Sequence, residues 1–114
     1  MNSELEILLP VYNEVKYLEK LLSGIHKSIN KKIKYNFLIC EDGSTDGTKE
    51  LIKKLKKKYN IKLITGKNRK GFSKAVQDGL KNANSEYVLM MDSDGQCDFK
   101  KIIEFWKYRK NYDS

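Results

Sequence analysis

Apolar residues follow two different spacings that alternate along the chain. Short continuous apolar runs predict strands, and they cover residues 5–9, 35–40, 61–65 and 87–91. Longer segments with apolar residues at steps of three and four predict helices, and they cover residues 15–29, 45–59, 72–83 and 100–110. Pro10 follows the first run and is expected to end that strand. For the second helix, Ser44 or Thr45 is the expected N-cap.

Strands that alternate with helices predict an α/β domain with a mostly parallel central sheet. The 114 residues fit one domain, since no linker, repeat or low-complexity segment interrupts the pattern. In such sheets, ligands bind beyond the carboxyl ends of the strands, where the direction of winding reverses. Polar motifs follow the first, second and fourth predicted strands, so we expect the functional site at this edge.

The segment after the first strand is Pro10-Val11-Tyr12-Asn13-Glu14. A structural interpretation makes Asn13 the N-cap of the first helix and places Glu14 at the positive end of the helix dipole. A functional interpretation makes Tyr12 a flat surface for a nucleotide base and Glu14 an acceptor of hydrogen bonds from the base or ribose. The residue types fit both interpretations.

The segment after the second strand is Glu41-Asp42-Gly43-Ser44-Thr45-Asp46-Gly47-Thr48. Its first half resembles a calcium-binding loop, but Lys53 stands at the twelfth position, where such loops need a bidentate Glu. Turn and capping roles account for its glycines and serine. They leave Asp42 without a structural role, so we expect Asp42 to hydrogen-bond the base or ribose of a nucleoside.

Basic residues lead into the third predicted helix in the segment Asn68-Arg69-Lys70-Gly71-Phe72-Ser73-Lys74-Ala75. Cations destabilise the N-terminus of a helix, so Lys70 and Lys74 are unfavourable for the helix alone. A bound diphosphate would remove this conflict, because the free N–H groups of a helix start attract anions. A solvated basic loop in a lysine-rich chain is an equally weighted alternative.

Two acids one residue apart follow the last strand, in Met91-Asp92-Ser93-Asp94-Gly95-Gln96. Carboxylates are hard oxygen ligands that suit Mg²⁺ or Mn²⁺ and leave positions for phosphate oxygens. We therefore expect Asp92 and Asp94 to hold a divalent metal. An isolated Asp-x-Asp is a weak signal, since acids are common in turns, and its weight comes from the other motifs.

Lysine and arginine number 23 against 15 aspartates and glutamates, which gives a net charge of +8. Charge alone is no binding site, and the lysines of residues 53–58 are expected to form a solvated helix face. With no bilayer-length apolar stretch and no signal-peptide pattern, we expect a soluble cytoplasmic protein. Cys40 and Cys97 are expected to be buried or idle thiols, and His26 to lie at the surface.

Taken together, the four motifs closely resemble those of the family 2 glycosyltransferases in residues, order and spacing. The resemblance covers nearly the whole chain and implies a GT-A fold, a Rossmann-like three-layer α/β domain with a mostly parallel sheet. It implies a nucleotide-sugar donor, either a UDP- or a GDP-sugar, with Mg²⁺ or Mn²⁺ as cofactor. Residues 1–114 look like the nucleotide-sugar-binding part, truncated after the Asp-x-Asp motif, with the acceptor part expected beyond Ser114.

The resemblance also implies roles for individual residues. The nucleotide-binding positions are Pro10, Tyr12, Glu14, Asp42, Gly71, Lys74 and Asp92. The metal-binding positions are Asp92, Asp94 and Gln96. Gln96 completes an Asp-x-Asp-x-Gln pattern, which is similar to the polyprenyl-phosphate sugar synthases, such as dolichyl-phosphate mannose synthase.

The reaction implied is inverting transfer of a sugar to a polyprenyl phosphate or a cell-surface saccharide, at the inner face of the membrane. No residue from 1 to 114 is an evident catalytic base, so the base is expected beyond Ser114. Peripheral membrane contact and self-association are further expectations, the latter through Phe105, Trp106 and Tyr108. No nucleic-acid partner is expected.

Three other functions compete with this interpretation. A non-catalytic nucleotide-binding module would keep the pocket and lack the acceptor part. A metal-dependent nucleotidyltransferase shares the α/β architecture, but the chain has no glycine-rich N-terminal loop for phosphates. A nucleic-acid binder would rest on net charge alone, and it would bind DNA in a salt-dependent way without responding to nucleotide sugars.

Overall fold

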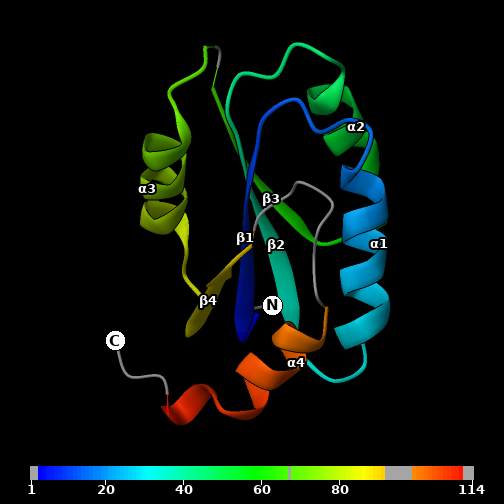
Figure 1. Cartoon of the computed structure of the whole chain (residues 1–114), viewed down its shortest axis with the longest axis vertical. Coiled ribbons are helices and arrows are strands. Elements are labelled where there is room, and N and C mark those ends of the chain that lie inside the picture. The colour runs from blue at the N-terminus through cyan, green and yellow to red at the C-terminus, as the bar shows by residue number, and fades with distance from the viewer. Residues whose placement is uncertain (1–2, 67, 92–98, 112–114) are drawn as a thin grey trace.

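The computed structural model describes residues 3–66, 68–91 and 99–111 (Figure 1). Its strands are β1 (Leu5–Val11), β2 (Tyr35–Glu41), β3 (Ile61–Thr65) and β4 (Tyr87–Met90). Its helices are α1 (Leu18–Ile29), α2 (Thr48–Leu55), α3 (Phe72–Asn82) and α4 (Phe99–Lys107), followed by a 3-10 turn, η1 (Arg109–Asn111). The predicted alternation of strands and helices is confirmed, and the differences lie at the ends of the elements.

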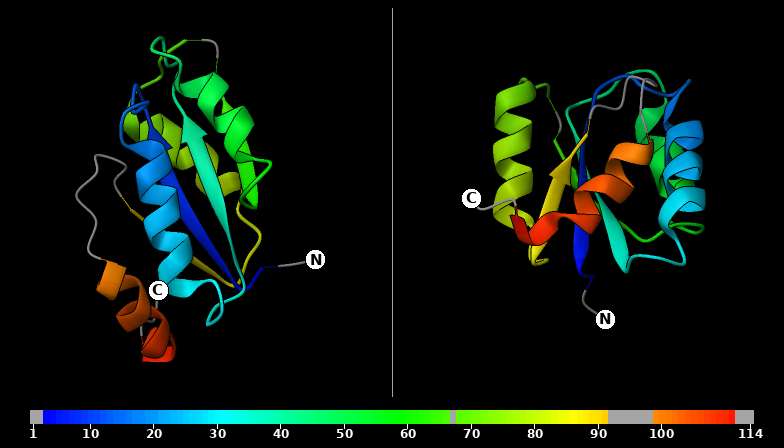
Figure 2. Two further views of the ribbon diagram at one scale, coloured as in Figure 1. Left: turned by 90° about the vertical axis from the view of Figure 1, so that its right-hand side faces the viewer. Right: turned by 60° about the horizontal axis from the view of Figure 1, so that its bottom comes forward.

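The four strands form one sheet in the order β3-β2-β1-β4, and every neighbouring pair is parallel. The chain moves outward from β1 to β3 and then returns to the other side of β1, so the winding reverses between β1 and β4. Helices α1 and α2 cover one face and α3 covers the other, while α4 packs beside α1 (Figures 1 and 2). The predicted three-layer α/β fold is confirmed.

Strand β1 lies at the centre of the domain, and all seven of its residues are buried. Its alternating side chains divide between the two faces, with Ile7 in the large cluster beneath α1 and α2 and Leu8 in the small cluster beneath α3. Cys40 belongs to the α3 cluster, and burial, with the nearby charge of Asp78, raises its thiol pKa to about 11. The prediction of a buried Cys40 is confirmed, whereas Cys97 lies outside the described residues.

Pro10 does not end the first strand, because β1 continues to Val11 and pairs with β2 along its whole length. The carbonyl of Leu8 accepts the N–H of Met91 at 2.9 Å. Backbone groups alternate between the two neighbouring strands, so those of Pro10, two residues on, also face the β4 side. Strand β4 ends at Met90, and Pro10 therefore lies past its last pair. A residue without an N–H is tolerated there, since the described pairing with β4 stops before that level.

The first two helices begin later than predicted. Asn13 adopts a left-handed conformation with φ of 52°, and α1 begins only at Leu18. Helix α2 begins at Thr48 after Gly47, which has a φ of 96°. Neither Asn13 nor the Ser44 and Thr45 pair caps a helix, so these predictions are wrong.

Glu6 is a buried carboxylate that fixes the approach to β4. Its Oε1 accepts hydrogen bonds from the N–H of Asn84 at 2.9 Å and from the N–H and hydroxyl of Ser85 at 3.1 Å. Its Oε2 is buried and finds no partner among the described residues. A buried carboxylate needs such donors, so the connection between α3 and β4 is held against the middle of the sheet.

Trp106 of α4 packs against β4, whereas Phe99 lies against Gly24 of α1. The Trp106 and Tyr87 rings meet edge to face at 5.7 Å, and the Arg109 guanidinium lies 3.9 Å from the centre of the Trp106 ring. Tyr108 remains 46% exposed. Self-association through this helix stays a prediction. None of the described helices has the length and apolar character needed to cross a bilayer.

Gly79 is where α3 approaches the sheet most closely. A Cβ added there would lie 2.3 Å from the Cys40 Sγ and 3.0 Å from the Leu8 Cδ1. We expect Gly79→Ala to lower the free energy of unfolding by about 1–2 kcal/mol, since overpacking outweighs the gain in helix propensity. Urea denaturation measures the change, with Gln77→Ala as an exposed control. Adding Cys40→Ala should recover part of the loss, and additive effects in the double variant would contradict this contact.

Candidate functional site

The loops after β1 and β2 meet at the carboxyl edge of the sheet and are braced together. The Asn13 N–H donates to the Ser44 Oγ at 3.0 Å, and the Thr45 N–H donates to the Asn13 Oδ1 at 2.8 Å. The Glu14 N–H donates to the Thr48 Oγ1 at 3.0 Å. These bonds explain why Asn13 and Ser44 cap no helix, because each satisfies the neighbouring loop instead.

Asp46 links the same two loops from the other side. Its carboxylate accepts the Thr48 N–H at 3.1 Å, the Thr48 hydroxyl and the Val15 N–H at 3.4 Å. Slight desolvation acts to raise the pKa of Asp46, but these hydrogen bonds outweigh it and lower the pKa below its ordinary value. The loop therefore holds Asp46 in its charged form.

Asp42 is buried at the end of β2 and ties a third loop to this edge. Its Oδ1 accepts the Lys70 N–H at 2.6 Å, and its Oδ2 accepts the Gly71 N–H at 2.9 Å. The expectation that Asp42 has no structural role is therefore wrong. Its contact with a nucleoside stays a prediction, and it is compatible with these bonds because a carboxylate offers about four lone-pair sites.

Two glycines allow the second and third loops to approach each other. Gly43 has a φ of 75°, and a Cβ there would lie 2.7 Å from the Arg69 backbone nitrogen. Gly71 has a φ of 98° at the position where its N–H meets Asp42. A larger residue would be strained at either position.

Arg69 covers the ring that the sequence assigned to a nucleotide base. Its guanidinium lies 4.1 Å from the centre of the half-buried Tyr12 ring, and its Nε lies 3.9 Å from the Asp42 Oδ2. The arrangement brings together two predicted site residues from separate motifs. Sequence reasoning missed Arg69, although it belongs to the same basic segment as Lys70 and Lys74.

The two lysines at the start of α3 have an acidic partner within the chain. Lys70 Nζ lies 2.9 Å from the Asp78 Oδ2, and Lys74 Nζ lies 3.5 Å from the Asp78 Oδ1. The hydrogen bond from Lys70, and then the charge of Lys74, lower the pKa of Asp78. Asp78 therefore accounts for the two lysines at the start of α3 without a bound anion. The sequence argument that they require a diphosphate is wrong.

Glu41 is a second structural carboxylate that sequence reasoning missed. It accepts hydrogen bonds from the Ser44 N–H and, at 2.6 Å, from the Thr65 hydroxyl. Lys49 Nζ lies 3.9 Å from the Glu41 carboxylate and donates to the Gly66 carbonyl at 3.0 Å. Glu41 thereby connects the ends of β2 and β3. A void of about 10 Å³ beside Glu41 and Asp42 is the size of one water, not of a nucleotide.

The predicted metal ligands Asp92, Asp94 and Gln96 lie outside the described residues. The structure places the chain up to Met91, whose N–H bonds to the Leu8 carbonyl beside β1. The segment that carries these residues therefore begins next to β1, at the reversal of winding. Within the described part of the chain, no group of three or more His, Cys, Asp and Glu side chains is arranged to hold a metal.

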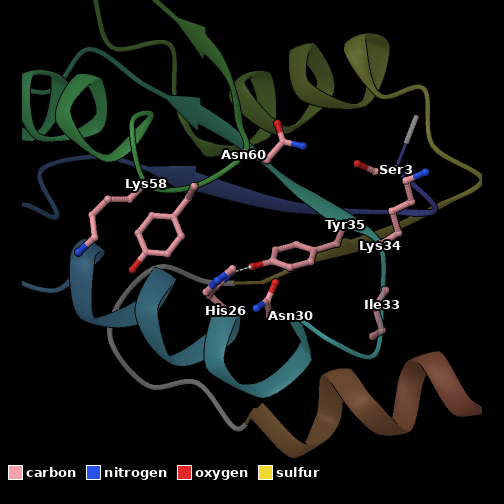
Figure 3. A pocket seen from close by; sticks show the side chains of 9 residues that line it. Ser3, His26, Asn30, Ile33, Lys34, Tyr35, Lys58 and Asn60 are labelled. Carbon is pink, nitrogen blue, oxygen red and sulfur yellow. Dashed lines mark hydrogen bonds between the residues drawn. The ribbon is translucent and has the colours of Figure 1, made fainter. Parts of the chain in front are cut away.

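His26 lies at the opposite edge of the sheet and is half-buried (Figure 3). Its Nδ1 lies 2.7 Å from the Tyr35 hydroxyl oxygen, and its ring meets the Tyr59 ring edge to face at 5.3 Å. The prediction of a surface histidine is therefore wrong. Its distance from the loops described above keeps it apart from the candidate site.

The Asp42 bonds to the loop before α3 can be tested directly. We expect Asp42→Asn to lower the free energy of unfolding by about 1–3 kcal/mol, because an amide group replaces one of two buried acceptors. Hydrogen exchange at the Lys70 and Gly71 amides should accelerate in the same variant. Asp78→Asn is the matched control, since it disturbs the Lys70 side chain and leaves both amides bonded. An unchanged rate of hydrogen exchange at these two amides in Asp42→Asn would contradict their hydrogen bonds to Asp42.

Comparison with known proteins identifies the family. The profile of the family described as "Glycosyl transferase family 2" matches residues 6–113. The dolichyl-phosphate beta-glucosyltransferase of Dictyostelium discoideum is 34% identical over 108 residues, covering 87% of this chain and 33% of that protein. The dolichol-phosphate mannosyltransferase of Pyrococcus furiosus is 34% identical over 93 residues, covering 82% of this chain and 26% of that protein.

Solved structures agree with the sequence comparison. The structure of Staphylococcus aureus TarS 1–349 in complex with UDP-GlcNAc has a TM-score of 0.80 at 27% identity, covering 97% of this chain and 32% of that one. The mannosyltransferase PcManGT of Pyrobaculum calidifontis, in complex with GDP-Man and Mn²⁺, shares the fold with a TM-score of 0.72 at 24% identity, covering 82% of this chain and 28% of that one. The chain thus spans about a third or less of its relatives' length, and it belongs to glycosyl transferase family 2.

Proposed function

We propose that this chain forms the nucleotide-sugar-binding part of an inverting, metal-assisted glycosyltransferase. The observation that carries the proposal is the joining of three motif-bearing loops at one edge of the sheet, where Asp42 accepts the N–H groups of Lys70 and Gly71. Its support is the family membership and the bound ligands of two structural neighbours, UDP-GlcNAc in one and GDP-Man with Mn²⁺ in the other.

The nucleoside would lie over the loops after β1 and β2. Tyr12 offers an aromatic face, and Asp42 and Glu14 offer carboxylate oxygens for the base or ribose. Pro10 would support this pocket from the end of β1. Gly71 and Lys74 lie at the N-terminus of α3, where helix N–H groups and the ammonium favour a diphosphate.

The donor set Asp92, Asp94 and Gln96 consists of oxygen ligands, which fits Mg²⁺ or Mn²⁺. When bound, such an ion would supply positive charge beside the departing diphosphate. Asp92 follows Met91 directly, and Met91 is bonded to β1. The ligand-bearing segment therefore starts at the same edge as the proposed nucleoside pocket.

The proposed reaction breaks one bond and forms another at the anomeric carbon. An acceptor oxygen attacks this carbon from the face opposite the nucleoside diphosphate, which departs with the electron pair of the broken bond. A polyprenyl phosphate acceptor already carries an anionic oxygen, whereas a saccharide hydroxyl must lose its proton to a base. The proposed acceptor is one of these two, with the enzyme acting at the cytoplasmic side of a membrane.

A non-catalytic nucleotide-binding module is the alternative within the same fold. The enzyme and the module are both expected to bind nucleotides, but only the enzyme is expected to transfer the sugar. A family-length protein carrying this sequence that binds UDP- or GDP-sugars, but never transfers the sugar to an acceptor with release of the nucleoside diphosphate, would favour the module.

Metal dependence of nucleotide binding tests the proposed ligand set. We expect UDP or GDP with Mn²⁺ to raise the thermal unfolding midpoint of the chain, with a stabilisation of about 2.7 kcal/mol at a hundredfold excess over Kd. Asp94→Asn should remove the Mn²⁺-dependent part of the shift, because it replaces a charged ligand by a neutral one. Glu86→Gln, which removes an exposed acid elsewhere, should leave the shift intact. A full Mn²⁺ response in Asp94→Asn would refute the assignment.

Arg69 must leave the Tyr12 ring before a base can stack there. We expect Arg69→Ala to tighten binding of a free nucleoside about two- to fivefold, because a cation–π contact of about 0.5–1 kcal/mol no longer competes. The same variant should bind the nucleoside diphosphate less favourably relative to the nucleoside, since a nearby cation is lost. Calorimetric titration of uridine, guanosine and their diphosphates gives both affinities.

Lys74→Ala is the matched control for this experiment, because it removes a cation from the same loop region without uncovering Tyr12. It should weaken binding of the diphosphate and leave the nucleoside affinity unchanged. Weaker nucleoside binding in Arg69→Ala would show that Arg69 supports the base rather than competing with it.

A further inference from the structure

A second pocket opens at the amino edge of the sheet, away from the loops that carry the family motifs (Figure 3). It has a volume of about 270 Å³, close to the lower end of the range for small-ligand sites, about 300–1,000 Å³. Ser3 precedes β1, Tyr35 opens β2 and Asn60 precedes β3, so three strand starts contribute to it. Its remaining walls come from the end of α1 and the segment after α2.

The lining of this pocket is rich in donors and contains no acid. Its nine residues are Ser3, His26, Asn30, Ile33, Lys34, Tyr35, Lys58, Tyr59 and Asn60. Two ammonium groups, two amides and four ring or hydroxyl groups can each donate a hydrogen bond. A group of this kind favours an anion that accepts several hydrogen bonds at once, and a phosphate fits better than a carboxylate because it offers more acceptor oxygens.

Contacts among three ring side chains hold one wall of the pocket in place. Tyr35 and His26 are hydrogen-bonded, and Tyr59 packs on the His26 ring. Burial, and then the neighbouring Tyr59, raise the pKa of Tyr35, so its hydroxyl keeps its proton. At the end of α1, the His26 and Ile29 carbonyls accept the Asn30 and Ile33 N–H groups, both at 2.9 Å, so these two carbonyls have partners within the chain.

The surroundings of the pocket are strongly basic. Residues 27–34 contain four lysines, residues 53–60 contain five, and neither segment contains an acid. All nine lysines are exposed. Among the described residues, Lys34 and Lys58 form no ion pair, whereas Lys49, Lys70 and Lys74 at the other edge each have one. The exposed Glu4 follows the lining residue Ser3 in the chain, but it does not line the pocket itself.

We propose that this pocket binds the phosphate group of a small ester or of a lipid headgroup. Lys34 and Lys58, at its two ends, supply positive charge, and the polar side chains between them supply hydrogen bonds (Figure 3). The surrounding lysines raise the local concentration of anions and direct them to the pocket. This site is separate from the proposed nucleotide site, because the two occupy opposite ends of the parallel strands. The proposal of a phosphate site is therefore independent of the glycosyltransferase activity.

The soluble form of the ligand is tested with sn-glycerol 3-phosphate and inorganic phosphate. In an ¹H–¹⁵N spectrum of the whole chain, we expect shifts at the amides of residues 26, 34, 35 and 60. Lys34→Gln with Lys58→Gln should weaken this binding about tenfold, because the positive charges at both ends of the pocket are lost. Lys81→Gln with Lys101→Gln removes the same charge from exposed positions elsewhere and should change the affinity little.

Tyr35→Phe gives a second variant that keeps the ring and removes the hydroxyl. It should weaken phosphate binding, because His26 loses the bond that fixes its ring. Shifts confined to the amides of residues 68–74 would place the phosphate at the start of α3 and overturn the proposal. Equal losses of affinity in the two lysine double variants would also overturn it, since the effect would then be one of net charge alone.

Vesicle binding distinguishes the two sources of the phosphate. Sedimentation with phosphatidic acid vesicles, against phosphatidylcholine vesicles, should show binding that depends on Lys34 and Lys58 if the source is a lipid headgroup. Binding of the soluble ester without vesicle binding would identify a free phosphate ester. The proposal is overturned if neither probe binds, or if duplex DNA binds and the Lys81 and Lys101 variant weakens it as much as the pocket variant does.

Discussion

Three buried carboxylates need hydrogen-bond donors, and meeting that need sets the positions of the loops in this domain. Glu6 in β1 takes donors from the connection that leads to β4. Glu41 and Asp42 at the end of β2 take donors from the loops on either side. Leaving such a group unpaired would cost more than the net value of each bond, so these hydrogen bonds hold the loops to the sheet.

This constraint links structure to the proposed chemistry. The loop that binds Asp42 through its backbone also carries Arg69, so the same tie that shapes the start of α3 brings a guanidinium onto Tyr12. The aromatic face proposed for the base is thus covered by the chain's own cation. A nucleotide would exchange one aromatic contact for another on Tyr12 and release a positive charge near the diphosphate, which makes base and phosphate recognition interdependent.

The order of the elements and the parallel sheet were predictable, because periodicity records which side chains are buried. The ends of the elements were not, since they depend on contacts between distant segments. Asn13 looks like an N-cap until Ser44 and Thr45 are seen beside it. Likewise, Asp42 seemed to have no structural role because its partners lie 28 and 29 residues away. The meeting of the first three motif-bearing loops at one edge was nevertheless predictable, since carboxyl ends of parallel strands lie together whatever their loops do.

The lysines of this chain differ in their pairing at the two edges of the sheet. The sequence alone shows only that lysines are in excess over acids. At the carboxyl edge, Glu41 and Asp78 pair with lysines and hold them in place around the motifs. At the amino edge, the exposed lysines have no acidic neighbours in their own segments. Paired cations contribute fixed geometry and little net field, whereas unpaired ones create a field that reaches about 8–10 Å into solution at physiological salt. The nine lysines of residues 27–34 and 53–60 therefore lie away from the family motifs, and they need an explanation other than nucleotide binding.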